Sequence, residues 1–233
     1  MAESSAPRRA LVTGAAKGIG AAIARRLAAQ GRSVVVADRD VAGAEAIAKE
    51  IGGRSAALDV TDFAQLRAVV AETGPFAIVV NNAGVDQHAF FTAMAEAEWR
   101  RLLEVNLVAV LAVAHATLPA MQAARFGRIV NIVSEAARLG SKGGSVYAAA
   151  KGGVISFTKS IARENARYGI TANCVAPGPI DTPMLHAGMA AVGVKLKDAV
   201  VDATLMKRLG TPDEVAAAVA FLASDEASYI TGE

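Results

Sequence analysis

The sequence contains a single cysteine, few aromatic residues and no long apolar run. Cys174 alone cannot form an internal disulfide, which excludes the small disulfide-rich secreted proteins. The longest apolar stretch near the middle covers residues 107–114 and falls far short of the roughly 18 to 20 residues that span a bilayer. The sequence therefore predicts no transmembrane helix and no membrane partner.

Runs of charge are also missing. The 24 basic and 22 acidic residues are scattered along the chain and give a formal net charge of +2, so no nucleic-acid surface is expected. The three histidines, His88, His115 and His186, are dispersed and with one cysteine offer no zinc ligand set. No metal is predicted.

The organisation of the chain is expected to be simple. Residues 1–9 lack the apolar core of a secretory signal, so we expect them to be a disordered lead-in and the protein to be cytoplasmic. Residues 10–233 suit one domain, because a hydrophobic content of 53% supports a substantial core in a chain of this length.

Short runs rich in Val and Ile alternate with longer segments of helical period. The short runs predict strands at residues 10–13, 33–37, 55–58, 76–80, 128–133 and 170–175. The longer segments predict helices at residues 18–30, 41–51, 62–72, 96–123, 147–168 and 212–223, and Pro119 is expected to kink or end the fourth. This alternation predicts an α/β fold: a single doubly wound Rossmann domain whose parallel sheet carries helices on both faces. Residues 180–209 are expected to form a loop or helical lid over a pocket.

A glycine-rich turn joins the first predicted strand to the first helix. Gly14, Gly18 and Gly20 would let the backbone approach a pyrophosphate at the helix N-terminus, although their spacing departs from the commoner G-x-G-x-x-G. Such turns also occur without a nucleotide. The nucleotide is favoured here by Asp38, which ends the second strand where an acidic side chain accepts hydrogen bonds from an adenosine ribose.

Asp38 also bears on the choice of cofactor. A carboxylate there would repel the 2′-phosphate of NADP and pair with the ribose hydroxyls of NAD, so NAD is predicted. Lys17 and Arg39 lie nearby in sequence and would receive a phosphate if Asp38 turned away, or they are ordinary solvated charges. NADP is the alternative.

Tyr147 and Lys151 are four residues apart and share one face of a predicted helix. A cation beside a phenol stabilises the phenolate and lowers a pKa that is about 10 in free tyrosine, which would let Tyr147 exchange protons with a substrate oxygen. Ser134 follows a strand and is placed to hold that oxygen. Asn106 interrupts an apolar helical run, either as a catalytic residue or as a side chain that satisfies buried backbone.

Taken together, these motifs resemble the short-chain dehydrogenases/reductases of the compact type. The resemblance covers nearly the whole chain. It rests on the glycine turn, on Asp59-Val60, on the Asn-Asn-Ala-Gly run at residues 81–84, on Ser134, on Tyr147-x-x-x-Lys151 and on Pro177-Gly178.

The resemblance implies a role for each residue of the site. Tyr147 would be the proton donor and acceptor, Ser134 would orient the substrate oxygen, Lys151 would also bind the nicotinamide ribose, and Asn106 would hold a water in a proton relay. Asp59 and Val60 would contact the adenine, the residues after Asn81 the adenosine side, and Ile180 and Thr182 the nicotinamide amide. The full set expected to bind the cofactor is Gly14, Lys17, Gly18, Ile19, Gly20, Asp38, Arg39, Asp59, Val60, Asn82, Ala83, Gly84, Tyr147, Lys151, Pro177, Gly178, Ile180 and Thr182.

The substrate is less well defined. The segments at residues 134–140 and 174–182 resemble the dehydrogenases of cyclic 2-hydroxyacyl-CoA substrates and, more broadly, the 3-oxoacyl thioester reductases. We therefore expect an NAD-dependent enzyme acting on a secondary alcohol or ketone, with an acyl thioester as a candidate. An NADP-dependent 3-oxoacyl reductase and a non-catalytic cofactor sensor are the alternatives.

The predicted helices at residues 96–123 and 147–168 are apolar around much of their circumference, which predicts a homo-oligomer. The family resemblance implies a tetramer. Members of the family usually continue past Gly232 into a final strand, whereas this sequence stops at Glu233.

Overall fold

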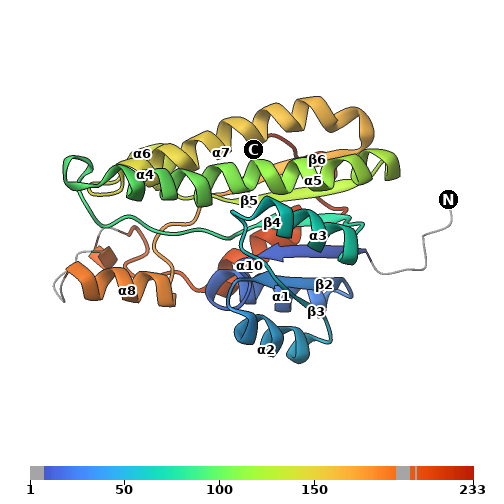
Figure 1. Ribbon diagram of the computed structural model, residues 1–233, viewed down its shortest axis with the longest axis horizontal. Helices are drawn as coiled ribbons and strands as arrows, with labels where there is room; N and C mark the ends of the chain where they lie inside the picture. The colour runs from blue at the N-terminus through green and yellow to red at the C-terminus, as the bar shows by residue number, and fades with distance from the viewer. Residues whose placement is uncertain (1–7, 193–199, 203) are drawn as a thin grey trace.

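The computed structural model describes residues 8–192, 200–202 and 204–233, and its centre is one parallel sheet (Figure 1). The strands are β1 (Arg9–Thr13), β2 (Ser33–Asp38), β3 (Arg54–Ala57), β4 (Ile78–Asn81), β5 (Gly127–Ile132) and β6 (Ile170–Val175). They lie in the order β3-β2-β1-β4-β5-β6, and each pairing is parallel. The doubly wound sheet predicted from the sequence is therefore confirmed, and its winding reverses between β1 and β4.

Helices connect the strands and cover both faces of the sheet (Figure 1). They are α1 (Gly18–Ala29), α2 (Val41–Ile51), α3 (Phe63–Thr73), η1 (Phe91–Ala93), α4 (Glu96–Leu103), η2 (Glu104–Val108), α5 (Ala109–Ala124), α6 (Ala136–Leu139), α7 (Ser145–Asn165), η3 (Ala166–Tyr168), α8 (Pro183–Val192) and α10 (Pro212–Leu222). The elements α4, η2 and α5 run on as one helix, Glu96–Ala124, in which η2 is a π turn.

Each central strand supplies apolar side chains to both faces of the sheet, as a covered parallel sheet requires. In β1, Ala10 and Val12 pack into the layer of α1, α2 and α10, whereas Leu11 packs into the layer of α3, α5 and α7. All three side chains are fully buried. Since burying one Val or Leu stabilises the fold by roughly 1.5–3 kcal/mol, this alternation fixes which way each strand faces.

Side-chain caps fix where several helices begin. Asp40, Asp62 and Thr211 each accept a hydrogen bond from a backbone N–H in the first turn of α2, α3 and α10, respectively. Such caps contribute about 1 kcal/mol each. Most predicted bounds agree with the structure to within two residues, counting η3 as the last turn of the helix predicted at residues 147–168.

Pro119 does not end the helix, which is one of the two predicted effects, because α5 continues to Ala124. Proline removes one N–H donor from the helix. The neighbouring turns are held by tertiary packing, since Met121 is buried, and by Thr117 Oγ1, which donates to the carbonyl oxygen of Val113 at 2.8 Å. This packing outweighs the one missing donor.

Two residues at the end of the predicted lead-in, Arg8 and Arg9, belong to the fold. Residues 1–7 lie outside the described residues, but Arg9 begins β1. Arg8 donates to both carboxylate oxygens of Asp225 at 2.7 and 2.8 Å, and its guanidinium lies 4.0 Å from the ring centroid of Phe126. The prediction is wrong for these two arginines because partners distant in sequence hold them.

The helix Glu96–Ala124 is long and apolar enough to cross a membrane by length and composition alone, a test that core helices of soluble proteins also pass. Val110, Val113 and Met121 of this helix are buried inside the protein, and so is the polar side chain of Asn106. These buried residues show that one side of the helix packs into the core.

Two segments near the end of the chain return to the sheet edge. Ile180 and Gly210 pair in an isolated parallel bridge, so the ends of the segment at residues 180–209 lie together, and α8 is its helical part. Residues 193–199 and 203 of this segment lie outside the described residues. The last residues run beside β6, where the N–H of Gly232 donates to the carbonyl oxygen of Ala172 at 2.8 Å.

Candidate active site

The sheet brings the predicted site residues to one edge. The carboxyl ends of β1 to β6 lead, in that order, to Gly14, Asp38, Asp59, Asn82, Ser134 and Pro177. Parallel strands share that edge, and α/β sheets bind ligands there, at the point where the winding reverses.

The turn after β1 leaves no room for side chains. Gly14 and Gly18 have φ angles of 63° and 57°, a left-handed conformation that glycine adopts without strain. A Cβ at Gly20 would lie 2.2 Å from the carbonyl oxygen of Gly14, and a Cβ at Gly14 would lie 2.7 Å from Cα of Ala83. The glycines therefore let the turn pack closely against the end of β4 and let a ligand approach the backbone.

Helix α1 starts from this turn with its N-terminus uncapped by any side chain. Its N-cap residue Lys17 makes no cap hydrogen bond, and its first turn, which includes Ile19 and Gly20, carries no acidic residue. First-turn N–H groups and the helix dipole attract anions. The turn and the helix start thus fit the pyrophosphate of a dinucleotide.

Asp38 is fixed by two backbone amides. Its Oδ2 accepts from the N–H of Ala16 at 2.9 Å, and its Oδ1 accepts from the N–H of Asp40 at 2.9 Å. Each carboxylate oxygen keeps a second acceptor site, so a ribose hydroxyl can still donate to it. The same carboxylate therefore also ties β2 to the glycine turn, a structural role that the sequence did not reveal.

The adenine side of the site contains further charges. Lys17 and Arg39 are both exposed. The carboxyl of Asp59 accepts hydrogen bonds from the side chain and the backbone N–H of Thr61, which lower its pKa, and the charge of Arg39 adds to that effect. Val60, next along the chain, is buried.

Asn82 joins the end of β4 to the glycine turn. Its Nδ2 donates to the carbonyl oxygens of Thr13 and Gly14 at 3.1 and 2.8 Å. In return, Thr13 Oγ1 accepts from the N–H groups of Asn82 and Ala83 at 3.1 and 3.2 Å. The side-chain amide of Asn82 is therefore engaged in building the site.

Asn106 lies in the π turn η2 and is fully buried. Its Oδ1 accepts from the N–H of Val85 at 3.2 Å, and its Nδ2 donates to the carbonyl oxygens of Val85 and Leu102 at 2.9 and 3.0 Å. A Cβ at Gly84 would lie 2.9 Å from Asn106 Oδ1. The side chain thus satisfies buried backbone, one of the two roles considered for it, and holds the loop after β4 against the helix.

Tyr147 lies at the start of α7, close to Ser134 and Lys151. A hydrogen bond with the side chain of Ser134 lowers the pKa of the phenol, and Lys151 Nζ lies 5.8 Å from the ring centroid. Ser134 Oγ also accepts from the N–H of Ala136 at 3.2 Å, which fixes its position after β5. The structure therefore brings three of the four predicted catalytic side chains together.

Lys151 is buried, with 4% of its surface exposed. Its Nζ donates to the carbonyl oxygen of Ile132 at 2.9 Å. Burial disfavours the charged ammonium and lowers the pKa of Lys151 to about 8.

We predict a lowered pKa for Tyr147 from Lys151 and an oxidised nicotinamide acting together, whereas the side chains of the protein alone have the opposite effect. Burial of the phenol and the nearby negative charge of Asp86 raise its pKa to about 12, and the hydrogen bond with Ser134 only partly opposes this. Burial dominates because the ammonium is directed at the carbonyl oxygen of Ile132. An oxidised nicotinamide carries a positive charge and would act in the opposite direction to burial.

The sequence analysis predicted no role for two residues of the loop after β4. Asp86 bears on the electrostatics of both Tyr147 and Lys151. Gln87 is buried, and its Oε1 accepts from the N–H groups of Val146 and Tyr147 at 2.9 and 3.0 Å. Neither residue belongs to a motif, so their only signal was their place directly after the Asn-Asn-Ala-Gly run.

The loop after β6 borders the site from the other side. Gly18 faces Thr182, since a Cβ at Gly18 would lie 3.6 Å from Thr182 Cγ2. Ile180 packs against the apolar core, and Thr182 Oγ1 accepts from the N–H of Leu185 in α8 at 3.3 Å. Pro177 accepts a backbone hydrogen bond from Glu135 at 3.0 Å, and the neighbouring Gly178 lies close to the Glu135 carboxylate. Ile180 and Thr182 are thus at the same sheet edge as the glycine turn, where the nicotinamide end of a cofactor was expected.

The residues present fit a dinucleotide at one end of this edge and a proton donor and acceptor at the other. A buried tyrosine next to a serine hydroxyl and a lysine is suited to moving one proton to or from an alcohol oxygen. The fold and the site together define an oxidoreductase that acts on CH–OH or keto groups with a nicotinamide cofactor.

Comparison with known proteins identifies the family. The model of the family described as "Enoyl-(Acyl carrier protein) reductase" matches residues 14–233. The chain belongs to the short-chain dehydrogenase/reductase family.

Individual relatives are similar along almost their whole length. The chain is 46% identical over 234 residues to the 3-oxoacyl-[acyl-carrier-protein] reductase FabG of Vibrio cholerae serotype O1, which covers 96% of this chain and 93% of the relative. A solved structure of 3-oxoacyl-[acyl-carrier protein] reductase from Brucella melitensis is 38% identical, with a TM-score of 0.90 over 97% of this chain and 87% of that one. A second Brucella melitensis structure, titled ribose-5-phosphate isomerase, is also 38% identical, with a TM-score of 0.92 over 97% of this chain and 89% of that one.

Proposed function

We propose that this protein is a 3-oxoacyl thioester reductase, which interconverts a ketone and a secondary alcohol on an acyl chain. The sequence analysis kept an NADP-dependent 3-oxoacyl reductase open as the alternative, and the 46% identity to the Vibrio cholerae reductase supports the reaction of that alternative. The observation that carries the proposal is the position of Tyr147, next to Ser134 and Lys151 at the cofactor edge of the sheet.

Each of these side chains has a step in the proposed reaction. The reduced nicotinamide, when bound, supplies a hydride for the carbonyl carbon. The hydroxyl of Ser134 orients the carbonyl oxygen, and the phenol of Tyr147 gives that oxygen its proton, so one hydride and one proton convert the ketone into the alcohol. Lys151 binds the nicotinamide ribose and supports the phenolate that remains. In the reverse direction, the phenolate takes the alcohol proton.

For the cofactor we propose NAD rather than NADP. Asp38 supports NAD, because its carboxylate is held in place by Ala16 and Asp40 and cannot turn away without losing both hydrogen bonds. A 2′-phosphate would then have to sit against a fixed negative charge. NADP requires instead that Lys17 and Arg39 overcome this repulsion.

A direct assay tests the reaction and the cofactor together. The purified protein is mixed with acetoacetyl-CoA and either NADH or NADPH, and the nicotinamide absorbance is followed. We expect turnover with both and a catalytic efficiency at least about tenfold higher with NADH, equivalent to about 1.4 kcal/mol. Cofactor binding without turnover on any oxoacyl thioester or secondary alcohol would favour the sensor alternative.

We further propose that α8 covers the substrate, as the helical part of the lid expected at residues 180–209. Its support is the contact between α8 and the loop after β4: a Cβ at Gly188 would lie 2.5 Å from Cε1 of His88. His88 is two residues from Asp86, whose charge reaches Tyr147. Substitution of Gly188 by a larger residue should therefore alter KM for the acyl substrate more than KM for the cofactor.

We propose a homo-oligomer, a tetramer, located in the cytoplasm. The helices α5 and α7 lie side by side over one face of the sheet, opposite the face that α1, α2 and α10 cover (Figure 1). Leu111 on α5 is exposed, and Phe157 on α7 is only partly buried. Light scattering at micromolar concentration tests the proposal, and a monomer would contradict it.

A further inference from the structure

The loop after β4 reaches across the site to the helix that carries Tyr147. Gln87 Oε1 accepts two hydrogen bonds, from the N–H of Val146 at 2.9 Å and from the N–H of Tyr147 at 3.0 Å. These amides belong to the second and third residues of α7, which begins at Ser145. They are the amides that an N-cap side chain normally satisfies.

Helix α7 has no such cap of its own. Its N-cap residue is Gly144, which has no side chain, and the first turn contains no acidic residue. Gln87 therefore supplies from 60 residues away in sequence what Asp40, Asp62 and Thr211 supply locally to α2, α3 and α10.

Gln87 is itself held rigidly. It is 6% exposed, and its Nε2 donates to the carbonyl oxygen of Ala89 at 2.8 Å and contacts Met94 Sδ at 3.0 Å. Two residues before it, Val85 is bound through both its N–H and its carbonyl oxygen to Asn106. The loop is thus tied at Val85 to the π turn and at Gln87 to the backbone of Tyr147.

We infer that Gln87 is a positioning residue, which fixes the start of α7 and so holds the phenol of Tyr147 against Ser134. The inference rests on the proposed function, in which Tyr147 transfers the proton. Displacing a reacting group by about 1 Å can lower a rate by about 100-fold. Gln87 lies at the substrate end of the site, so its loss should affect the chemical step and leave cofactor binding unchanged.

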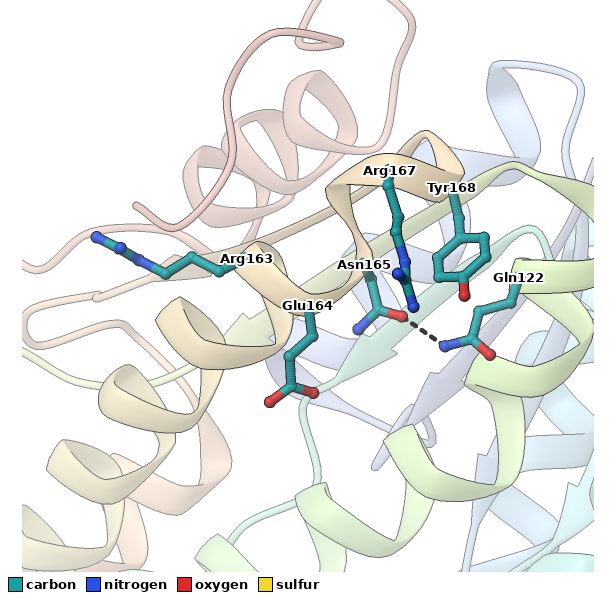
Figure 2. A pocket seen from close by; sticks show the side chains of 6 residues that line it. All are labelled: Gln122, Arg163, Glu164, Asn165, Arg167 and Tyr168. Atoms are coloured by element: carbon teal, nitrogen blue, oxygen red, sulfur yellow. Dashed lines mark hydrogen bonds between the residues drawn. The ribbon is translucent and has the colours of Figure 1, made fainter.

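Gln87→Met tests the inference, because methionine keeps the length and apolar bulk of the side chain but removes the acceptor. We expect kcat to fall about 10- to 100-fold, with KM for the cofactor changed less than about twofold. The matched control is Gln122→Met on α5, whose hydrogen-bond partner Asn165 is the last residue of α7, at the end opposite to Tyr147. Gln122 Nε2 donates to Asn165 Oδ1 at 2.7 Å in a surface hollow (Figure 2), and Asn165 lies roughly 27 Å along α7 from Tyr147. This control should keep wild-type kcat.

Gln87→Glu separates positioning from general support of the fold. Its carboxylate retains an acceptor for both amides, so kcat for alcohol oxidation should recover to within about fivefold of wild type at high pH. The added negative charge should also raise the pKa of Tyr147. Alcohol oxidation needs the phenolate, so the limb of the pH–rate profile that rises with pH should move to higher pH.

The outcomes are distinguishable. Equal kcat in Gln87→Met, Gln122→Met and wild type would overturn the inference, and so would a Gln87→Glu variant as slow as Gln87→Met at every pH. If circular dichroism shows that Gln87→Met is unfolded, Gln87→Asn takes its place, since it retains the amide but is too short to reach α7. Tyr147→Phe is assayed alongside: wild-type turnover in that variant would refute the proposed function rather than the role of Gln87.

Discussion

The buried ammonium of Lys151 should make the folded protein less stable at neutral pH, so that removing it increases stability while destroying activity. Burial lowers its pKa from 10.5 to about 8. At about 1.4 kcal/mol per pKa unit, keeping the proton on Lys151 in the folded state costs about 3 kcal/mol at pH 7. Lys151→Met removes this cost but also the donor to the carbonyl oxygen of Ile132, a loss of about 1 kcal/mol. We therefore expect the free energy of unfolding to increase by about 2 kcal/mol at pH 7.

The direction in which stability changes with pH follows from the two pKa values of Lys151, one in the unfolded chain and one in the folded protein. Between about pH 8 and 10.5 the unfolded chain binds the Lys151 proton and the folded protein does not, so the wild type gains stability as the pH rises. Tyr147 and Cys174 act in the opposite direction at higher pH, because burial raises the pKa of each and the folded state retains a proton that the unfolded chain loses. Only the difference between wild type and variant isolates Lys151. The advantage of Lys151→Met should shrink from about pH 8 upward and reverse by about pH 10.

Urea denaturation followed by circular dichroism, at one protein concentration and at several pH values between 7 and 10, measures this difference. Turnover measured on the same samples should fall by at least about 100-fold in Lys151→Met. A variant less stable than wild type at pH 7, or a difference that stays constant with pH, would refute the reasoning and show that Lys151 is neutral or solvated in the folded protein.

Three further predictions concern the chemistry of the site. Tyr147→Phe should lower turnover at least about 100-fold and leave the cofactor dissociation constant nearly unchanged, as measured by fluorescence titration with NADH. Asp86→Asn should lower the pKa of Tyr147, because it removes a negative charge that raises it, and so shift the pH–rate profile for alcohol oxidation to lower pH; an unshifted profile would mean that another group titrates. Asp38→Asn removes the charge but keeps one acceptor for the backbone, so it should narrow the preference for NAD over NADP by about tenfold in catalytic efficiency; an unchanged ratio would show that Lys17 and Arg39 set the choice.

The fold could be predicted well because burial has a local signature. A strand covered on both faces must be apolar at successive positions, and Val34, Val35 and Val36 of β2 meet that condition in any sequence context. The helix did not end at Pro119, where packing around the proline outweighs the missing donor, and the prediction failed at Arg8, which is held by a carboxylate more than 200 residues away. Contacts between distant residues leave no periodic pattern in the sequence.

In the candidate site, too, some features could be predicted from the sequence and others depend on contacts between distant residues. Gly14, Gly20, Tyr147 and Lys151 were recognisable, because a backbone turn without room for a Cβ, or a phenol with a movable proton, admits very few residue types. The pKa of Tyr147 was not predictable, since it depends on burial and on Asp86, and neither follows from the spacing of Tyr147 and Lys151.

Gln87 shows why sequence motifs do not reveal positioning residues of this kind. The start of α7 needs only an acceptor for two amides, and Asp, Asn, Ser, Glu or Gln would each provide one if the backbone placed it at the right distance. The requirement is therefore one of position, set by the path of the loop after β4 between Asn106 and α7, and not one of residue type. Enzymes of this family that share Tyr147 and Lys151 should accordingly differ at the position of Gln87, and the acceptor for the first turn of the catalytic helix should then come from another residue. A survey of solved family structures for the group bound to those two amides would test this, and many members with neither amide bonded would contradict it.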